Sequence, residues 1–169
     1  MTRGDLTTIG INGGTQEFRV AASATRGYAG EPINSLAALT AGVADVNTVV
    51  VLTDGKPVVA TDNFVGIASK NMEVNSSGTV IAHRLWVTVP IPSITRISGR
   101  ALTKASVDTD SELLGVMWDT VLFDLTSGAY TIDQTAAANT SGLTIRDGNT
   151  FLGTLQVIVD ARVMRNAVT

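Results

Sequence analysis

His83 is the one histidine of the 169-residue chain, and histidine is the side chain best suited to acid–base chemistry near neutral pH. It stands beside Arg84 in a stretch whose apolar alternation predicts a β-strand, and there is no second histidine to share a metal ion. The serines of "SSG" and "SGR" lack the G-x-S-x-G context of a hydrolase nucleophile. We therefore expect His83 at the surface, no catalytic residues and no enzymatic activity.

The sequence context of the carboxylates predicts turns and no catalytic role. Most of the aspartates stand next to Gly, Thr or Asn, where an Asp side chain bonds to the backbone of its own turn. The run "DTDSE", residues 108–112, has oxygen ligands at alternate positions like a calcium loop, but it lacks the glycine and the bidentate glutamate of such a loop. We expect a polar loop there, with no metal site and no cofactor.

Composition removes several further classes of protein. Cysteine is absent, which excludes disulfides, zinc–thiolate sites, iron–sulfur clusters and cysteine nucleophiles. The net charge of −3 is spread without a basic block, so nucleic acid is not the expected partner. Charged residues make up only 16% of the chain, which suits a surface partly covered by another protein or one rich in Ser, Thr and Asn. No apolar run approaches the roughly 20 residues of a membrane helix, so no membrane partner is expected.

Short runs rich in β-branched residues, separated by turn residues, predict an all-β fold: a compact β-barrel or β-sandwich with an extended N-terminal arm. Residues 1–29 read as the arm, because Phe18 and Val20 are the only strong apolar alternation in a segment rich in Gly, Thr, Ala and Ser. Residues 30–169 form the β-domain, in which residues 91–169 either complete the barrel or form a second lobe.

Several strands can be placed in the β-domain. Asp54-Gly55 is a hairpin signal after a first strand, and Pro90 and Pro92 end a strand at an edge or at a crossing between sheets. Residues 111–125 read as two strands, residues 146–149 as a hairpin turn and residues 153–165 as a closing strand with Leu155, Val157 and Val159 on one face. The remaining predicted strands are Val46–Leu52, Pro57–Ala60, Phe64–Ala68, Gly78–Ala82 and Leu85–Val89.

The two tryptophans, Trp86 and Trp118, lie in apolar stretches. We expect both to pack in the core, with the alternative that one anchors a protein interface, where aromatic residues concentrate.

The order of features carries a resemblance. "AGEPI" is followed by "VVVLTDGKPVVATDNFVGIASKNMEVNSSGTVIAHRLWVTVP", and this succession over residues 28–90 resembles the head decoration, or cement, proteins of tailed bacteriophages. The resemblance implies a homo-oligomer, a trimer rather than a dimer, made in the host cytoplasm and located in the virion. It would bind the major capsid protein on the outer surface of the expanded head and stabilise the joints between capsomers.

On the basis of this resemblance, we assign residues to contacts with the capsid protein and to contacts between copies of the chain. The capsid-binding residues would be those of the arm: Arg3, Phe18, Arg19, Arg26 and Tyr28. Self-association would use Trp86 and the corner of Pro90, Ile91 and Pro92. The alternative function is a carbohydrate- or receptor-binding β-module of a phage fibre or tail.

Overall fold

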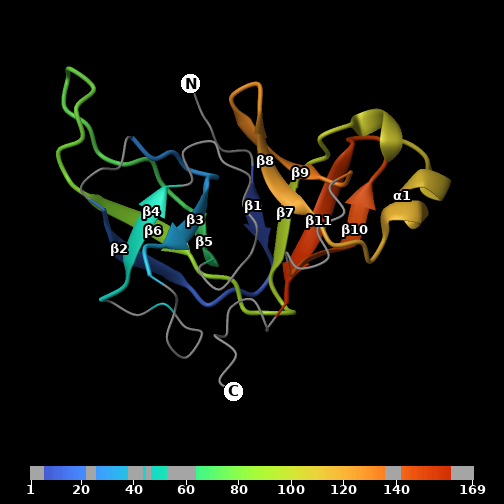
Figure 1. Cartoon of the computed structure of the whole chain (residues 1–169), viewed down its shortest axis with the longest axis horizontal. Coiled ribbons are helices and arrows are strands. Elements are labelled where there is room, and N and C mark those ends of the chain that lie inside the picture. The colour runs from blue at the N-terminus through green and yellow to red at the C-terminus, as the bar shows by residue number, and fades with distance from the viewer. Residues whose placement is uncertain are drawn as a thin grey trace.

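The computed structural model describes residues 6–21, 26–37, 44, 47–52, 64–135 and 142–160. It confirms an all-β fold that contains a closed barrel, two further sheets and one short α-helix (Figure 1). The barrel lies at one end of the long axis, and the helix lies at the other end. The predicted hairpin at Asp54-Gly55 and the strand Pro57–Ala60 fall outside the described residues.

Five strands close the barrel in the order β2-β4-β3-β5-β6, with β6 pairing back onto β2. The β2–β4 pair is parallel, and the other pairs are antiparallel. The barrel strands are β2 (Thr15–Val20), β3 (Pro32–Ser35), β4 (Val49–Leu52), β5 (Phe64–Ala68) and β6 (Arg84–Thr88).

Alternation explains which side chains fill the barrel. Phe18 and Val20 of β2 point inward with Leu85 and Val87 of β6, while the residues between them are exposed. At β5 the sequence needs a glycine, because a Cβ on Gly66 would lie 2.2 Å from the carbonyl oxygen of Thr88. The close approach of β5 to β6 therefore depends on that residue.

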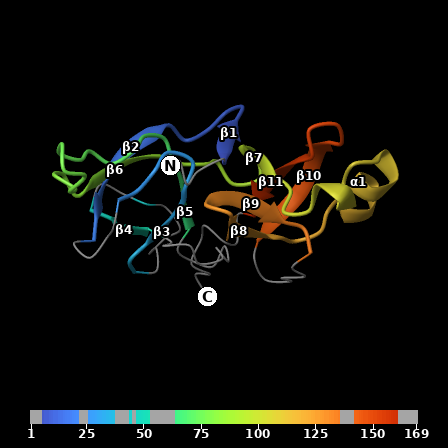
Figure 2. The ribbon, with the colours of Figure 1, turned by 90° about the horizontal axis from the view of Figure 1, so that it is seen from above.

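A four-stranded antiparallel sheet in the order β1-β7-β11-β10 lies beside the barrel, and a hairpin of β8 and β9 packs next to it (Figures 1 and 2). The link from β6 to β7 runs through Pro90 and Pro92, so these prolines do mark a crossing from one sheet to another. The strands are β1 (Thr7–Ile9), β7 (Arg96–Arg100), β8 (Leu122–Thr126), β9 (Ala129–Asp133), β10 (Leu143–Asn149) and β11 (Thr154–Val159).

The predicted elements of this half are partly correct. The inward face of β11 is confirmed, because Leu155, Val157 and Val159 are fully buried. The hairpin turn expected at residues 146–149 is wrong: these residues belong to β10, and the chain turns at residues 150–153, where Gly153 has a φ of 65°. The strand expected at Gly78–Ala82 is reduced to a single bridge between Val74 and Val80.

The first of the two strands expected in residues 111–125 is instead the helix α1 (Asp110–Val116), preceded by a 3₁₀ turn at Lys104–Ser106. A capping box sets its start: the Thr109 hydroxyl accepts a bond from the Glu112 amide, and the Glu112 carboxylate accepts one from the Thr109 amide. The "DTDSE" run is thus a helix start. No described helix is long and apolar enough to cross a membrane.

The expected N-terminal arm is not present over residues 6–20. Leu6 and Phe18 are each 1% exposed, β1 pairs with β7, and β2 is a wall of the barrel. Phe18 and Val20 are the only two apolar residues that β2 buries, but β2 is still an ordered strand. Its backbone groups are hydrogen-bonded to β4 and β6 of the same chain.

One core runs through both halves of the molecule. Phe64 of β5 and Phe123 of β8 meet with ring centroids 6.2 Å apart and ring planes tilted by 47°, a favourable aromatic geometry. The barrel and the second half are therefore packed together through large side chains.

Candidate functional site

The outer side of β2 and β6 carries an aromatic residue among cations. Glu17 is opposite Trp86 and Arg19 is opposite Arg84 in the antiparallel register, so Arg19 and Trp86 are diagonal neighbours on one face. Lys70, from the segment after β5, completes the group. We call Glu17, Arg19, Lys70, Arg84 and Trp86 the barrel face.

The barrel face is basic although the whole chain is acidic. Three cations surround one carboxylate, and Arg84 is paired with that carboxylate, Glu17, at 2.7 Å. The Arg84 side chain is largely exposed and the Glu17 side chain is partly exposed, so this ion pair contributes little to stability, about 0–1 kcal/mol. Arg19 is exposed and forms no ion pair with any described residue. The face therefore has positive charge to offer a partner.

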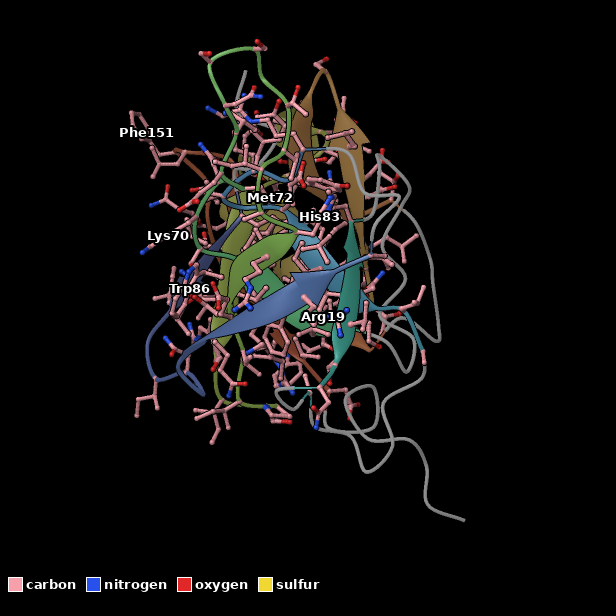
Figure 3. All side chains as sticks on the ribbon, turned by 90° about the vertical axis from the view of Figure 1, so that its left-hand side faces the viewer. Arg19, Lys70, Met72, His83, Trp86 and Phe151 are labelled. Carbon is pink, nitrogen blue, oxygen red and sulfur yellow. The ribbon has the colours of Figure 1, made fainter. Side chains whose placement is uncertain are left out.

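Trp86 is 41% exposed, and the Lys70 ammonium nitrogen lies 5.4 Å from its ring centroid. Seen from the barrel end, Trp86 and Lys70 project together from one side of the molecule (Figure 3). An exposed tryptophan held by a cation is a typical centre of a protein–protein contact.

A second exposed tryptophan lies at the other end of the molecule, directly after α1. Trp118 is 64% exposed, and the Arg146 guanidinium carbon lies 3.8 Å from its ring centroid. Exposed Leu114, Phe151 and Leu152 belong to α1 and to the β10–β11 turn at the same end. We call Leu114, Trp118, Arg146, Phe151 and Leu152 the helix end.

The helix end is held by backbone and side-chain bonds. The Trp118 amide donates to the carbonyl of Ile145 at 3.0 Å, and Lys104 donates to the carbonyl of Phe151 at 2.8 Å. Trp118 has a φ of 76°, a conformation that costs a non-glycine residue free energy. The ring is thus presented to solvent by a strained but fixed backbone.

These arrangements suit binding. His83 is exposed at the start of β6, and among the described residues no three His, Asp or Glu side chains gather as metal ligands. Hydrogen bonds, first from the Thr109 side chain and then from Asp108, lower the pKa of the Glu112 carboxyl. That shift belongs to the helix cap.

The residues predicted as capsid contacts are separated by the structure. Arg3 lies outside the described residues. Phe18 is wrong as a contact, because the alternation of β2 turns it into the barrel core. Arg26 and Tyr28 are half-buried and stack on each other, with the guanidinium carbon 5.0 Å from the ring centroid. Of the four described residues in this prediction, Arg19 is the one that lies on an exposed strand face.

The predicted self-association residues are also divided. Trp86 is exposed, whereas Pro90 is buried and is wrong as a contact residue; Ile91 and Pro92 are half-buried in the link to β7. The expectation that both tryptophans pack in the core is wrong, since each stands on an outward position. The pairing of β2 with β6 brings Arg19 and Trp86 onto one face.

Sequence reasoning missed Lys70, Arg84, Arg146 and the exposed apolar residues of the helix end. The alternation in β6 contained a signal, because Leu85 and Val87 inside require Trp86 outside. No comparable signal existed for Arg146 and Trp118, which meet through tertiary packing.

Comparison of the chain with protein-family models, curated proteins and solved structures gives no match.

Proposed function

We propose that this chain is a decoration, or cement, protein of a tailed-phage head, which binds the major capsid protein on the outer surface of the expanded shell and stabilises the joints between capsomers. The observation that supports the proposal is the pair of exposed tryptophans, each with a cation over its ring, on the barrel face and at the helix end. A molecule with a binding group at each end can bridge two neighbours.

The chemistry of both sites favours protein partners. Trp and Arg are the residue types that contribute most to binding free energy at protein interfaces. The barrel face is basic and the helix end is mostly apolar, so we assign the barrel face to an acidic region of the capsid protein and the helix end to a second copy of the chain. This replaces the arm as the means of attachment. Many modest contacts on a shell then add up to firm attachment.

An exposed tryptophan ring is also what a carbohydrate-binding module of a fibre or tail presents, and this remains the second candidate function. A cation already covers one face of each ring, which leaves less room for stacking on a sugar. Glycan binding in the absence of capsid would favour this second candidate.

Co-sedimentation with expanded heads that lack the protein tests the proposal. Trp86→Ser should weaken binding about tenfold or more, because an interface hot spot contributes roughly 2 kcal/mol. Trp118→Ser should leave the contact between the barrel face and the capsid protein intact. It should lower the amount of protein bound at saturation, because self-association through the helix end is lost. Ile81→Ser changes another exposed apolar residue, which is not stacked by a cation, and should bind like the unaltered protein. Wild-type binding by both tryptophan variants would contradict the proposal.

A further inference from the structure

A groove separates β1 from the barrel wall. Its volume is about 300 Å³, and residues 6–8 of the β1 region line one side. Small residues line most of the other side: Ala29, Gly30, Ala68 and Ser69. In Figure 1, β1 stands beside β7 at the junction between the barrel and the second sheet. Ile67 and Thr88 complete the barrel side. The groove therefore has residues of an edge strand on one wall and mostly small residues on the other.

The β1 wall offers unpaired backbone groups. β1 is the last strand of its sheet and, among the described strands, pairs with β7 alone. In an antiparallel pair, alternate residues direct their N–H and C=O away from the partner strand, so part of the β1 backbone points away from β7, and Thr7 and Thr8 of this strand line the groove. An exposed strand edge is a ready template for another extended chain.

On the opposite wall, several hydrogen-bond donors are already used within the barrel. The Gly30 amide donates to the carbonyl of Ala68 at 2.7 Å, and the Ala68 amide donates to the carbonyl of Glu31 at 2.8 Å. The Ser69 hydroxyl donates to the carbonyl of Trp86 at 3.1 Å. These donors are not available to a guest in the groove, so the free edge of β1 is the wall that offers it main-chain donors.

The lining also limits what that guest can be. None of the described residues that line the groove is charged or aromatic, so these residues offer no counter-charge to a phosphate or carboxylate ligand and no stacking surface to a sugar. Hydroxyls and small apolar groups suit a peptide with small, uncharged side chains. Main-chain hydrogen bonds to β1 would supply the affinity, and contact with the barrel wall would select peptides with small side chains.

We propose that this groove binds an extended, uncharged peptide segment of a partner protein, which adds as a strand to the free edge of β1. The inference goes beyond the proposed function and concerns the isolated protein, so either one can fail without the other. On a shell, the inserted segment would come from a neighbouring chain.

Titration of the isotope-labelled protein with a blocked peptide of alternating threonine and alanine tests this by NMR. The peptide should cause saturating shifts of the Thr7, Thr8 and Ser69 amides. The same peptide with alternate backbone amides methylated should cause none, because it lacks the donors that pair with β1. No shift at millimolar peptide, or equal shifts with the methylated peptide, would overturn the proposal, as would shifts caused by a neutral disaccharide and not by the peptide.

Blocking variants locate the site. Ala29→Leu places a larger side chain in the groove and should abolish the shifts, whereas Ala105→Leu, on the exposed 3₁₀ turn, should leave them unchanged. Ser69→Leu is a second blocking variant at an exposed lining position, should Ala29→Leu disturb the fold. If both blocking variants fold and still bind, the groove is not the peptide site.

Discussion

Trp118 combines a costly backbone conformation with an exposed ring. A non-glycine residue with positive φ loses about 1–2 kcal/mol, and glycine avoids this loss. We predict that Trp118→Gly is more stable than Trp118→Ala by about 1 kcal/mol, although both lose the stacking on Arg146. Urea unfolding of the two variants measures this difference, and a more stable alanine variant would show that the strain is absent.

The helix cap gives a second prediction about single residues. Thr109→Ala should reduce stability by about 1 kcal/mol, because it removes the N-cap of α1. In the same variant, the pKa of Glu112 should rise toward its ordinary value, since the Thr109 hydroxyl is the first cause of its lowering. NMR titration of the Glu112 carboxyl follows the second effect, and an unmoved pKa would contradict the assigned cause.

The direction of the pH effect follows from that lowered pKa. A carboxyl whose pKa is lower in the folded state stabilises that state at pH values above its unfolded pKa. The contribution of Glu112 is lost as the pH falls through its folded pKa. We therefore expect the stability difference between the native chain and Thr109→Ala to shrink in acid, as measured by unfolding at a series of pH values.

Individual residues also mark the limit of prediction from sequence. Alternation placed Leu155, Val157 and Val159 in the core, because strand geometry alone decides their side. Hydrophobicity alone predicted the wrong location for Trp86 and Trp118. Each ring is exposed and is stacked by a cation, Lys70 on Trp86 and the sequence-distant Arg146 on Trp118.

At the scale of elements, two glycines make a matched pair. Gly66→Ala should destabilise the barrel by about 3 kcal/mol or more, because the new Cβ collides with the Thr88 carbonyl between β5 and β6. Gly115→Ala in α1 meets no atom within 4 Å and should stabilise the helix by up to about 1 kcal/mol. Thermal unfolding of both variants measures whether each one is less or more stable than the native chain. A Gly66→Ala variant of unchanged stability would refute the close approach of β5 to the Thr88 carbonyl.

Strands were predicted best where turn residues or a proline bounded at least one end of the apolar run. Phe64–Ala68 was predicted with the bounds of β5, and Leu85–Val89 lies within one residue of β6. The helix α1 was missed because seven residues are too few for a clear 3.6-residue period, although the spacing of Thr109 and Glu112 matches a capping box. The arm was mistaken because the partners of β1 and β2 are distant in sequence.

At the scale of the molecule, the shared core predicts a single folding unit. Phe64 and Phe123 join the barrel to the second half, and each half carries one tryptophan. We expect Trp86→Phe and Trp118→Phe, followed by the fluorescence of the remaining tryptophan, to unfold at midpoints that agree with circular dichroism for each variant. A transition of one half that clearly precedes the other would mean that the contact between the rings does not couple them.

The proposed attachment to a phage head depends on the whole molecule, because it requires binding groups at both of its ends. The number of copies bound per expanded head at saturation tests it most directly. We predict a plateau at a number fixed by the symmetry positions of the shell and little binding to isolated glycans. Failure to bind expanded heads, or uptake that rises without a plateau, would contradict the account.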